Sequence, residues 1–385
     1  MYFCEKLTSE ERSVGVVTAS AGNHAQALAR HGKITGTSVT VVMPEQAPLV
    51  KVESCRQLGA NVILHGPGFG HAKAMAMHIA KKTGAIYVNG YDHPHILAGQ
   101  GSMGIEILED VPDLDYIICP IGGGGLVAGI ASAVKYLRPN VKIIGVESTR
   151  TPSWTTALIE GKPILCNSTV SGSKQTIADG LSVPHVGVNA FHTAANLIEK
   201  VIQIDEDWIA IAILKLLETE KAVVEGAGAS GLGAILTGSL PELMNKKVAV
   251  VLCGGNIDIT TLGRVIERAL LATGRLCRFT ITVSDRPGGL AKFLNICADA
   301  GVCVKDMQHD RVLLTSFVYK TQLICTVETR GKDQEDDLKK RLEEVYDPED
   351  ITWLEFEIAG GNPDDSASIT ETHETSHVVS ESSTR

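Results

Sequence analysis

The stretch PIGGGGLVAGIASA, residues Pro120–Ala133, follows the apolar run YIIC and carries four consecutive glycines into an Ala-rich helical pattern. Glycine lets backbone N–H groups approach an anion closely, and the N-terminus of a helix adds a partial positive charge. This composition between a strand and a helix predicts a phosphate-binding turn in an α/β protein. The alternative is a tight strand-to-helix turn that requires only small residues.

The same strand-to-helix pattern repeats through most of the chain. From Val14 to about Ala272, short β-branched runs alternate with Ala-rich stretches of helical periodicity. Apolar strands that alternate with amphipathic helices predict parallel sheets built from βαβ units. The eight strand candidates are VGVVTA, TSVTVVM, NVILHG, AIYVNG, YIICPI, VKIIGVE, VIQI and KVAVVLCGG.

The pattern changes after Gly274. The residues that follow show a strand, a helix, two strands and a charged helix, which is the order of a ferredoxin-like α+β domain. We place this domain at 275–358. The last residues, 359–385, are rich in Ser, Thr, Glu and Asp and have little to bury, so their composition predicts a disordered tail.

Charge and cysteine content narrow the classes of function. The 385 residues carry a formal net charge of −10, which argues against a nucleic-acid partner. The nine cysteines include no CxxC pair, a pattern typical of free thiols in a reducing compartment. No apolar run reaches the roughly 20 residues of a membrane span. We therefore expect a cytoplasmic protein with no membrane partner, and the histidine spacing predicts no metal site.

Two further polar turns follow predicted strands, SAGNH at Ser20–His24 and LCGGN at Leu252–Asn256. The glycine turn alone also fits a dinucleotide, because a G-x-G-x-x-A pattern begins at Gly123 and Glu147 lies where a ribose-binding acid would be expected. That pattern explains neither of the other turns. Three turns on parallel sheets suit a small ring held at its phosphate, its substituents and its nitrogen, and pyridoxal phosphate has that shape.

The motifs TASAGNHAQALA, IGGGGL, ADGL and LCGGN occur in this order, and as an ordered set they closely resemble the serine/threonine dehydratase and serine racemase family. These proteins are fold type II pyridoxal-phosphate enzymes, and the similarity covers residues 7–270. It implies two lobes of open parallel sheets, a smaller one at 1–100 and a larger one at 101–272. Residues 277–310 resemble an ACT domain, which implies an ACT-like regulatory role for the ferredoxin-like domain.

The resemblance also implies a role for each turn. Asn23 would hydrogen-bond the cofactor's ring oxygen, the glycine turn would bind its phosphate, and Cys253 would face the ring nitrogen. The implied residues for pyridoxal 5'-phosphate are Asn23, Gly122, Gly123, Gly124, Gly125, Leu126 and Cys253. The implied substrate-binding residues are Ser20, Ala21, Asn23, His24 and Gly180, and the implied effector turn consists of Asp285, Gly288, Gly289 and Leu290.

By the same resemblance the protein is a pyridoxal-phosphate-dependent L-threonine/L-serine ammonia-lyase, which forms 2-oxobutanoate or pyruvate and ammonia. Ala21 stands where racemases of the family carry a proton-donating Ser, and Ser153 stands where they carry a metal-binding Asp. Racemisation and a metal site are therefore disfavoured. The ACT-like domain implies an amino-acid effector and a homo-oligomer. Serine racemase and an NAD-dependent oxidoreductase remain open as alternatives.

Members of this family carry their Schiff-base lysine in an SFKxRGA segment upstream of the SAGNHAQ motif. The stretch KLTSEERSVGVV, at Lys6–Val17, aligns with the residues just after that segment. We therefore expect an N-terminally shortened form of the fold from which the Schiff-base lysine is absent, and accordingly a poorly active chain. The alternative is a non-catalytic truncated isoform or an amino-acid-binding regulatory subunit.

Overall fold

The computed structural model describes residues 1–166, 176–311 and 319–354. These residues form two compact units, one at Met1–Asp258 and one that begins at Ile259, and each is considered by itself. No helix of the described segments combines the length and the apolar character that a membrane crossing requires.

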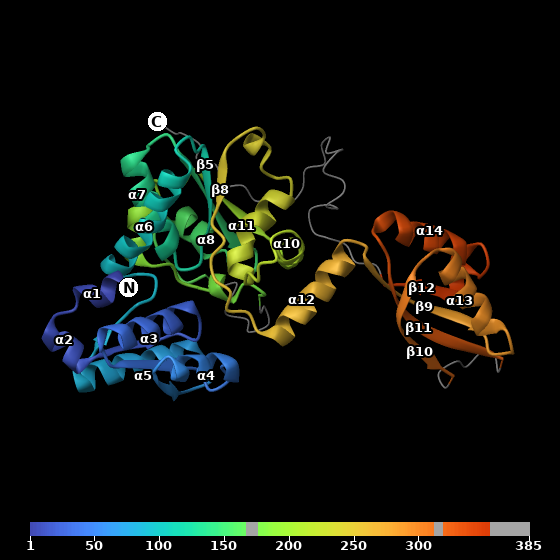
Figure 1. Ribbon diagram of the computed structural model, residues 1–385, viewed down its shortest axis with the longest axis horizontal. Coiled ribbons are helices and arrows are strands. Elements are labelled where there is room, and N and C mark those ends of the chain that lie inside the picture. The colour runs from blue at the N-terminus through green and yellow to red at the C-terminus, as the bar shows by residue number, and fades with distance from the viewer. Residues whose placement is uncertain (167–175, 312–318, 355–385) are drawn as a thin grey trace. The chain divides into compact units, whose positions relative to one another are not determined.

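The smaller lobe of the first unit, which begins in blue at the N-terminus in Figure 1, is built on a parallel sheet. Its strand order is β3-β2-β1-β4. Its central strand β1 is buried throughout, because all four of its residues are apolar or carry a single hydroxyl. The strands are β1 (Val16–Ala19), β2 (Val39–Met43), β3 (Asn61–Leu64) and β4 (Ile86–Tyr87). The helices are α1 (Tyr2–Lys6), α2 (Ser9–Val14), α3 (Asn23–Thr35), α4 (Leu49–Gln57) and α5 (Phe69–Thr83).

The larger lobe has a second parallel sheet, with the strand order β7-β6-β5-β8. Its strands are β5 (Tyr116–Pro120), β6 (Lys142–Ser148), β7 (Lys200–Ile204) and β8 (Val248–Val250). Its helices are α6 (Pro94–Asp110), α7 (Gly125–Leu137), α8 (Ser153–Glu160), α9 (Val188–Ala194), α10 (Glu206–Thr219) and α11 (Gly226–Leu236), with short 3-10 turns at Asp179–Leu181 and Pro241–Leu243. All eight predicted strands are present, so the predicted parallel α/β architecture is confirmed.

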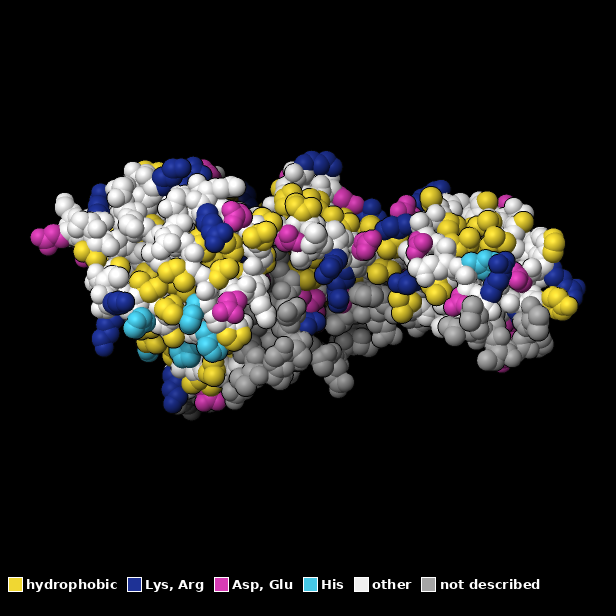
Figure 2. Space-filling view, turned by 90° about the horizontal axis from the view of Figure 1, so that it is seen from below, with side chains coloured by type: hydrophobic (Ala, Val, Ile, Leu, Met, Phe, Trp, Pro, Cys, Tyr) yellow, Lys and Arg dark blue, Asp and Glu magenta, His cyan; other side chains and the backbone are white. Residues whose placement is uncertain are grey.

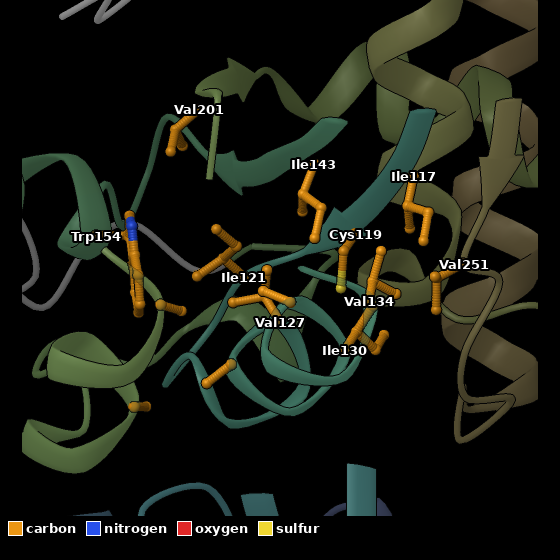
Figure 3. Packing of buried hydrophobic residues seen from close by; sticks show 14 of the residues in the cluster. Ile117, Cys119, Ile121, Val127, Ile130, Val134, Ile143, Trp154, Val201 and Val251 are labelled. Atoms are coloured by element: carbon orange, nitrogen blue, oxygen red, sulfur yellow. The ribbon is translucent and has the colours of Figure 1, made fainter. Parts of the chain in front are cut away.

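The core of the larger lobe fixes the glycine turn in place. Ile117 and Cys119 of β5 pack with Val127, Ile130 and Val134 of α7, and these side chains are fully buried (Figure 3). The turn between β5 and α7 therefore joins two elements that are locked by their apolar faces. Its backbone is held at both ends before any ligand binds.

The second unit consists of an antiparallel sheet with helices on it. The strand order is β10-β11-β9-β12, and the apolar faces of the strands bury Phe279, Ile281 and Leu323 against Phe293 and Leu338 of two helices. The elements are α12 (Ile259–Ala272), β9 (Leu276–Ser284), α13 (Gly289–Asp299), β10 (Cys303–Asp310), β11 (Lys320–Glu328), α14 (Lys332–Glu343), a 3-10 turn (Pro348–Asp350) and β12 (Ile351–Trp353). The predicted β-α-β-β-α order is present, and β12 completes the ferredoxin-like pattern. The expected tail at 359–385 lies outside the described residues.

Candidate active site

The three polar turns of the first unit all follow the carboxyl ends of parallel strands, namely β1, β5 and β8. They line one cleft with a volume of about 2090 Å³. The predicted cofactor- and substrate-binding residues that contribute to its wall are Ser20, Ala21, Asn23, His24, Gly122, Gly123, Gly124, Gly125, Leu126, Gly180 and Cys253. The whole predicted set, although widely spread along the chain, therefore meets at one place, where parallel sheets commonly bind ligands.

The glycine turn has no room for side chains at its centre. A Cβ atom on Gly123 would lie 2.3 Å from ring carbons of Tyr91. Gly124 adopts a φ of +89°, which L-residues with side chains rarely adopt, and a Cβ atom there would lie 2.3 Å from the ring of Trp154. The helix α7 begins directly after this turn, and no described side chain caps it. Its first backbone N–H groups are therefore available to an anion in the cleft.

The turn after β1 places one polar side chain in the cleft and buries another. Ser20 Oγ accepts a hydrogen bond from the Gly22 N–H at 3.2 Å. Asn23 is the first residue of α3, and its exposed side chain faces the cleft. The His24 ring packs against Gly90, and burial lowers the pKa of His24 to about 4. His24 is therefore neutral at physiological pH and adds no charge to this wall.

The turn after β8 presents a neutral thiol. Burial, with a smaller contribution from the nearby charge of Glu225, raises the pKa of Cys253 to about 11. Cys253 is therefore a protonated thiol at physiological pH. Gly254, the next residue, has a φ of +82°, which turns the chain sharply away from the strand.

Glu225 is a residue of the cleft outside the predicted set. It precedes α11, is 4% exposed, and accepts a hydrogen bond from Asn23 Nδ2 at 2.7 Å. The signal in the sequence is an acid within the Gly-rich stretch VVEGAGASG, which predicts a further turn near the cofactor, but such an acid equally suits an ordinary helix start. Tyr91, whose ring packs against the glycine turn, lies in no sequence motif that predicts this role.

Two lysines are among the described residues that line the cleft, Lys51 and Lys73. Lys51 Nζ lies 2.6 Å from Asp179 Oδ2, and the Lys51 side chain is 12% exposed. Its ammonium group is therefore paired with a carboxylate. The expected absence of a Schiff-base lysine stays a prediction.

Glu147, the acid of the dinucleotide alternative, does not line the cleft. It is fully buried and accepts hydrogen bonds from the backbone N–H groups of Trp154 at 2.9 Å and Thr155 at 3.2 Å. Burial raises the pKa of Glu147 to about 7. Because this carboxylate caps α8 inside the protein, it cannot share a ligand with the glycine turn.

The predicted effector turn lies at the surface of the second unit. On one face of this unit, Figure 2 shows a histidine beside basic and acidic side chains. Arg311 donates hydrogen bonds to both carboxylate oxygens of Asp285 at 3.1 to 3.2 Å. Gly288 has a φ of +94° and α13 begins at Gly289, while Leu290 packs at the edge of the core. The four residues thus form one turn, and their binding role stays a prediction.

Comparison with known proteins places this cleft in a family. A family model described as "Pyridoxal-phosphate dependent enzyme" matches residues 1–254. An L-threonine ammonia-lyase of Thermotoga maritima is 43% identical over 305 residues, which cover 79% of this chain and 74% of that protein. An L-threonine ammonia-lyase of Geobacter sulfurreducens is 41% identical over 342 residues, which cover 88% and 84%.

Among solved structures, the processed form of threonine deaminase isoform 2 from Solanum lycopersicum aligns with a TM-score of 0.65 at 33% identity. The alignment covers 70% of this chain and 77% of that one. The cleft also fits the cofactor by its own geometry, because it combines a glycine cradle, an uncapped helix start and a neutral thiol. The family prediction is confirmed: the chain belongs to the fold type II pyridoxal-phosphate-dependent enzymes, in the threonine ammonia-lyase and serine racemase group.

Proposed function

We propose that the first unit converts L-threonine to 2-oxobutanoate and ammonia, and L-serine to pyruvate and ammonia. The observation that carries this proposal is that the three strand-end turns meet in one cleft. The names of the two relatives, both L-threonine ammonia-lyases, support the reaction of L-threonine. Pyridoxal phosphate, when bound, withdraws electrons from the substrate and so acidifies its Cα–H bond.

The chain's own residues would hold the cofactor at three points. The backbone N–H groups at the start of α7 would bind the phosphate, and Gly123 and Gly124 keep the approach free of side chains. The Asn23 amide would donate to the ring oxygen. Cys253, as a protonated thiol, would leave the ring nitrogen uncharged, which suits elimination better than long-lived carbanion chemistry.

The turn at Ser20–His24 would bind the substrate carboxylate through backbone N–H groups at the start of α3, with Gly180 on the facing wall. Ala21 supplies no proton to the second face of the substrate. Proton transfer would therefore take place on one face only, and elimination is favoured over racemisation.

A second candidate is an amino-acid-binding subunit without catalysis. The observation that favours it is the ion pair of Lys51 with Asp179. Lys51 is one of the two described lysines that line the cleft, and its ammonium group is held by a carboxylate instead of being available to a cofactor. Borohydride reduction of the protein with its cofactor, followed by peptide mass spectrometry, separates the two candidates. A cofactor fixed on a lysine supports the lyase, and unmodified lysines together with retained amino-acid binding support the subunit.

For the second unit we propose a regulatory role as an ACT-like domain at 275–358, and for the chain before it we propose lobes at 1–100 and 101–272. The support is the ferredoxin-like order of elements and the turn from Asp285 to Leu290. An amino acid would bind at this turn and act between copies of a homo-oligomer. Isothermal titration with individual amino acids tests this role, and Gly288→Val should abolish any heat that comes from the turn.

The catalytic proposal is tested by incubating the purified chain with pyridoxal phosphate and L-threonine and by measuring ammonia and 2-oxobutanoate. Equal amounts of the two products are the expected result, at a low rate if a positioned base is lacking, because such a base contributes about 10²- to 10⁴-fold. If pyridoxal phosphate fails to bind, or if D-allothreonine, the product of inversion at Cα, forms instead of the two products, the proposal is wrong.

A further inference from the structure

Glu225 connects the two lobes across the cleft. It precedes α11 in the larger lobe, yet its side chain does not cap that helix. Instead, Glu225 Oε1 accepts a hydrogen bond at 2.7 Å from Nδ2 of Asn23, the first residue of α3 in the smaller lobe. With 4% of its surface exposed, this carboxylate needs such partners, because a buried charge is costly unless it is hydrogen-bonded.

The second oxygen of Glu225 is also used. Glu225 Oε2 accepts a hydrogen bond from the Asn256 backbone N–H at 2.9 Å. The Asn256 side chain then accepts, through Oδ1, a hydrogen bond of 3.2 Å from Gln26 Nε2. Since Gln26 lies one turn after Asn23, the start of α3 is held at two points by the larger lobe.

The backbone around the carboxylate leaves space for this contact. A Cβ atom on Gly254 would lie 2.3 Å from Glu225 Oε1 and 2.8 Å from Asn23 Nδ2. Gly254 also accepts, through its carbonyl, a hydrogen bond of 3.1 Å from the Glu225 N–H. Gly254 therefore has two roles: it allows the sharp turn after Cys253, and its lack of a side chain leaves room for the Glu225–Asn23 hydrogen bond.

A second polar contact joins the same walls. Lys51 of α4 pairs with Asp179 at 2.6 Å, and both charges act on Glu225. Burial is the main cause that raises the pKa of Glu225; Asp179 raises it further, while the bonds from Asn23 and Asn256 and the charge of Lys51 lower it. The hydrogen bonds thus favour the charged form that accepts from Asn23.

We propose that Glu225 is a positioning residue that fixes the Asn23 amide toward the cofactor and holds the start of α3 against the larger lobe. The inference rests on the cofactor role proposed above for Asn23. A carboxylate accepts only from the NH₂ side of an amide, so the contact sets which way the amide points. One N–H of Asn23 is bound to Glu225, and the second, which has no partner among the residues that the structure describes, can donate to an oxygen of the ring.

The functional consequence is pre-organisation. Asn23 is exposed in the cleft, so without Glu225 its side chain would sample several rotamers and both amide orientations. Holding it before the cofactor binds removes that entropy loss from the binding step. Glu225 itself acts through Asn23 and need not touch the reacting atoms.

The test compares the wild-type chain with Glu225→Gln, Asn23→Ala and the double variant, with Glu220→Gln as a charge control on an exposed acid of the same lobe. Two quantities are measured: the Kd for pyridoxal phosphate by absorbance titration, and amide hydrogen exchange of the peptide that contains residues 22–27, without cofactor. We expect Glu225→Gln and Asn23→Ala each to weaken binding about tenfold. The double variant should be no weaker than the worse single variant, because the two side chains act as one unit.

Hydrogen exchange decides the inference without the cofactor. Glu225→Gln should speed exchange in residues 22–27, which belong to the other lobe, whereas a merely local role would change only the residues around 225 and 254. Unchanged exchange in 22–27, or additive losses of affinity in the double variant, overturns the inference. If the wild-type chain binds no pyridoxal phosphate, the proposed function fails while the exchange result still decides the role of Glu225.

A second variant covers the case in which Glu225→Gln does not fold. Asn23→Asp changes an exposed side chain without changing its size, and it places a carboxylate against Glu225. We expect the same faster exchange in residues 22–27 and the same weakened binding. Exchange and affinity equal to those of the wild-type chain would overturn the inference.

Discussion

Two glycine turns of this molecule have nearly the same local backbone and very different surroundings. In the first unit, Gly124 with a φ of +89° precedes the 13-residue helix α7, and in the second unit Gly288 with a φ of +94° precedes the 11-residue helix α13. A Cβ atom on Gly124 would meet the Trp154 ring at 2.3 Å, whereas one on Gly288 would meet none of the described residues within 4 Å. The backbone conformation of the glycine is therefore enough to begin a helix in both turns. Only the side chains packed around Gly124 turn that helix start into an enclosed site.

The side chains around each turn also determine which charged groups a bound ligand would meet. The first turn lies in a cleft whose nearby Cys253 and His24 are both neutral. In the second turn, Asp285 is already paired with Arg311. An anion would therefore meet uncommitted N–H groups in the first turn and an ion pair beside the second.

The sharpest way to break this comparison is to add one methyl group to each turn. Gly124→Ala combines a left-handed backbone with a clash against Trp154, so we expect it to cost about 2 to 5 kcal/mol of unfolding free energy. Gly288→Ala has only the backbone strain, about 1 to 2 kcal/mol. Urea denaturation of both variants measures the difference, and equal losses would contradict the packing argument.

A neighbouring position separates ligand binding from stability. Gly123→Ala places a Cβ atom 2.3 Å from the Tyr91 ring, and we expect about a hundredfold weaker binding of pyridoxal phosphate. Gly263→Ala is the matched control, because a Cβ atom on Gly263 meets no described atom within 4 Å. Adding Tyr91→Ala to Gly123→Ala removes the clash and should recover part of the affinity. Wild-type affinity in Gly123→Ala would show that the turn does not hold the phosphate.

The neutral thiol offers a smaller and pH-dependent effect. Because the pKa of Cys253 is raised to about 11, its thiolate is scarce at pH 8 and grows as the pH rises toward 11. A thiolate with a high pKa is the better nucleophile, but at pH 8 its low abundance has the larger effect on the rate. We therefore expect alkylation of Cys253 at pH 8 to be about twentyfold slower than that of an exposed thiol such as Cys303. Residue-resolved mass spectrometry over a pH series checks this, and a Cys253 rate that levels off below pH 9 would refute it.

The smallest effect is expected at the second turn. Arg311 is 63% exposed, and a surface ion pair contributes about 0 to 1 kcal/mol, so Arg311→Ala should barely change the unfolding free energy of the second unit. The same variant leaves the Asp285 carboxylate beside His309, whose Nε2 lies 3.8 Å from Asp285 Oδ1. If Arg311→Ala lowers the unfolding free energy by more than about 2 kcal/mol, the ion pair stabilises the fold, which would contradict this expectation.

The strands were predictable because each is a short β-branched or apolar run, and β1 and β5 are buried along their whole length. The helix α11 was not, because GAGASGLGAIL has poor intrinsic helix propensity. Its glycines instead permit close packing: a Cβ atom on Gly231 would lie 2.9 Å from Val250 and one on Gly233 would lie 3.1 Å from the Trp208 backbone. Tertiary contact overrides propensity there.

The residues of the candidate site likewise fall into those that the sequence could predict and those that it could not. The polar turns could be found from the sequence because each couples a strand end to a glycine or a small polar residue within a few positions. The contact of Glu225 with Asn23 could not, because the two residues are 202 positions apart and only the folded chain brings them together. Tyr91 and Trp154 likewise acquire their role as walls from packing alone.

The measurement that tests the central claim most directly is a crystal structure of this chain with pyridoxal phosphate bound. The expected result is a phosphate against the first N–H groups of α7, the ring oxygen within hydrogen-bond distance of Asn23, and the ring nitrogen facing Cys253. A cofactor bound away from the glycine turn, or one whose ring contacts neither Asn23 nor Cys253, would contradict the account.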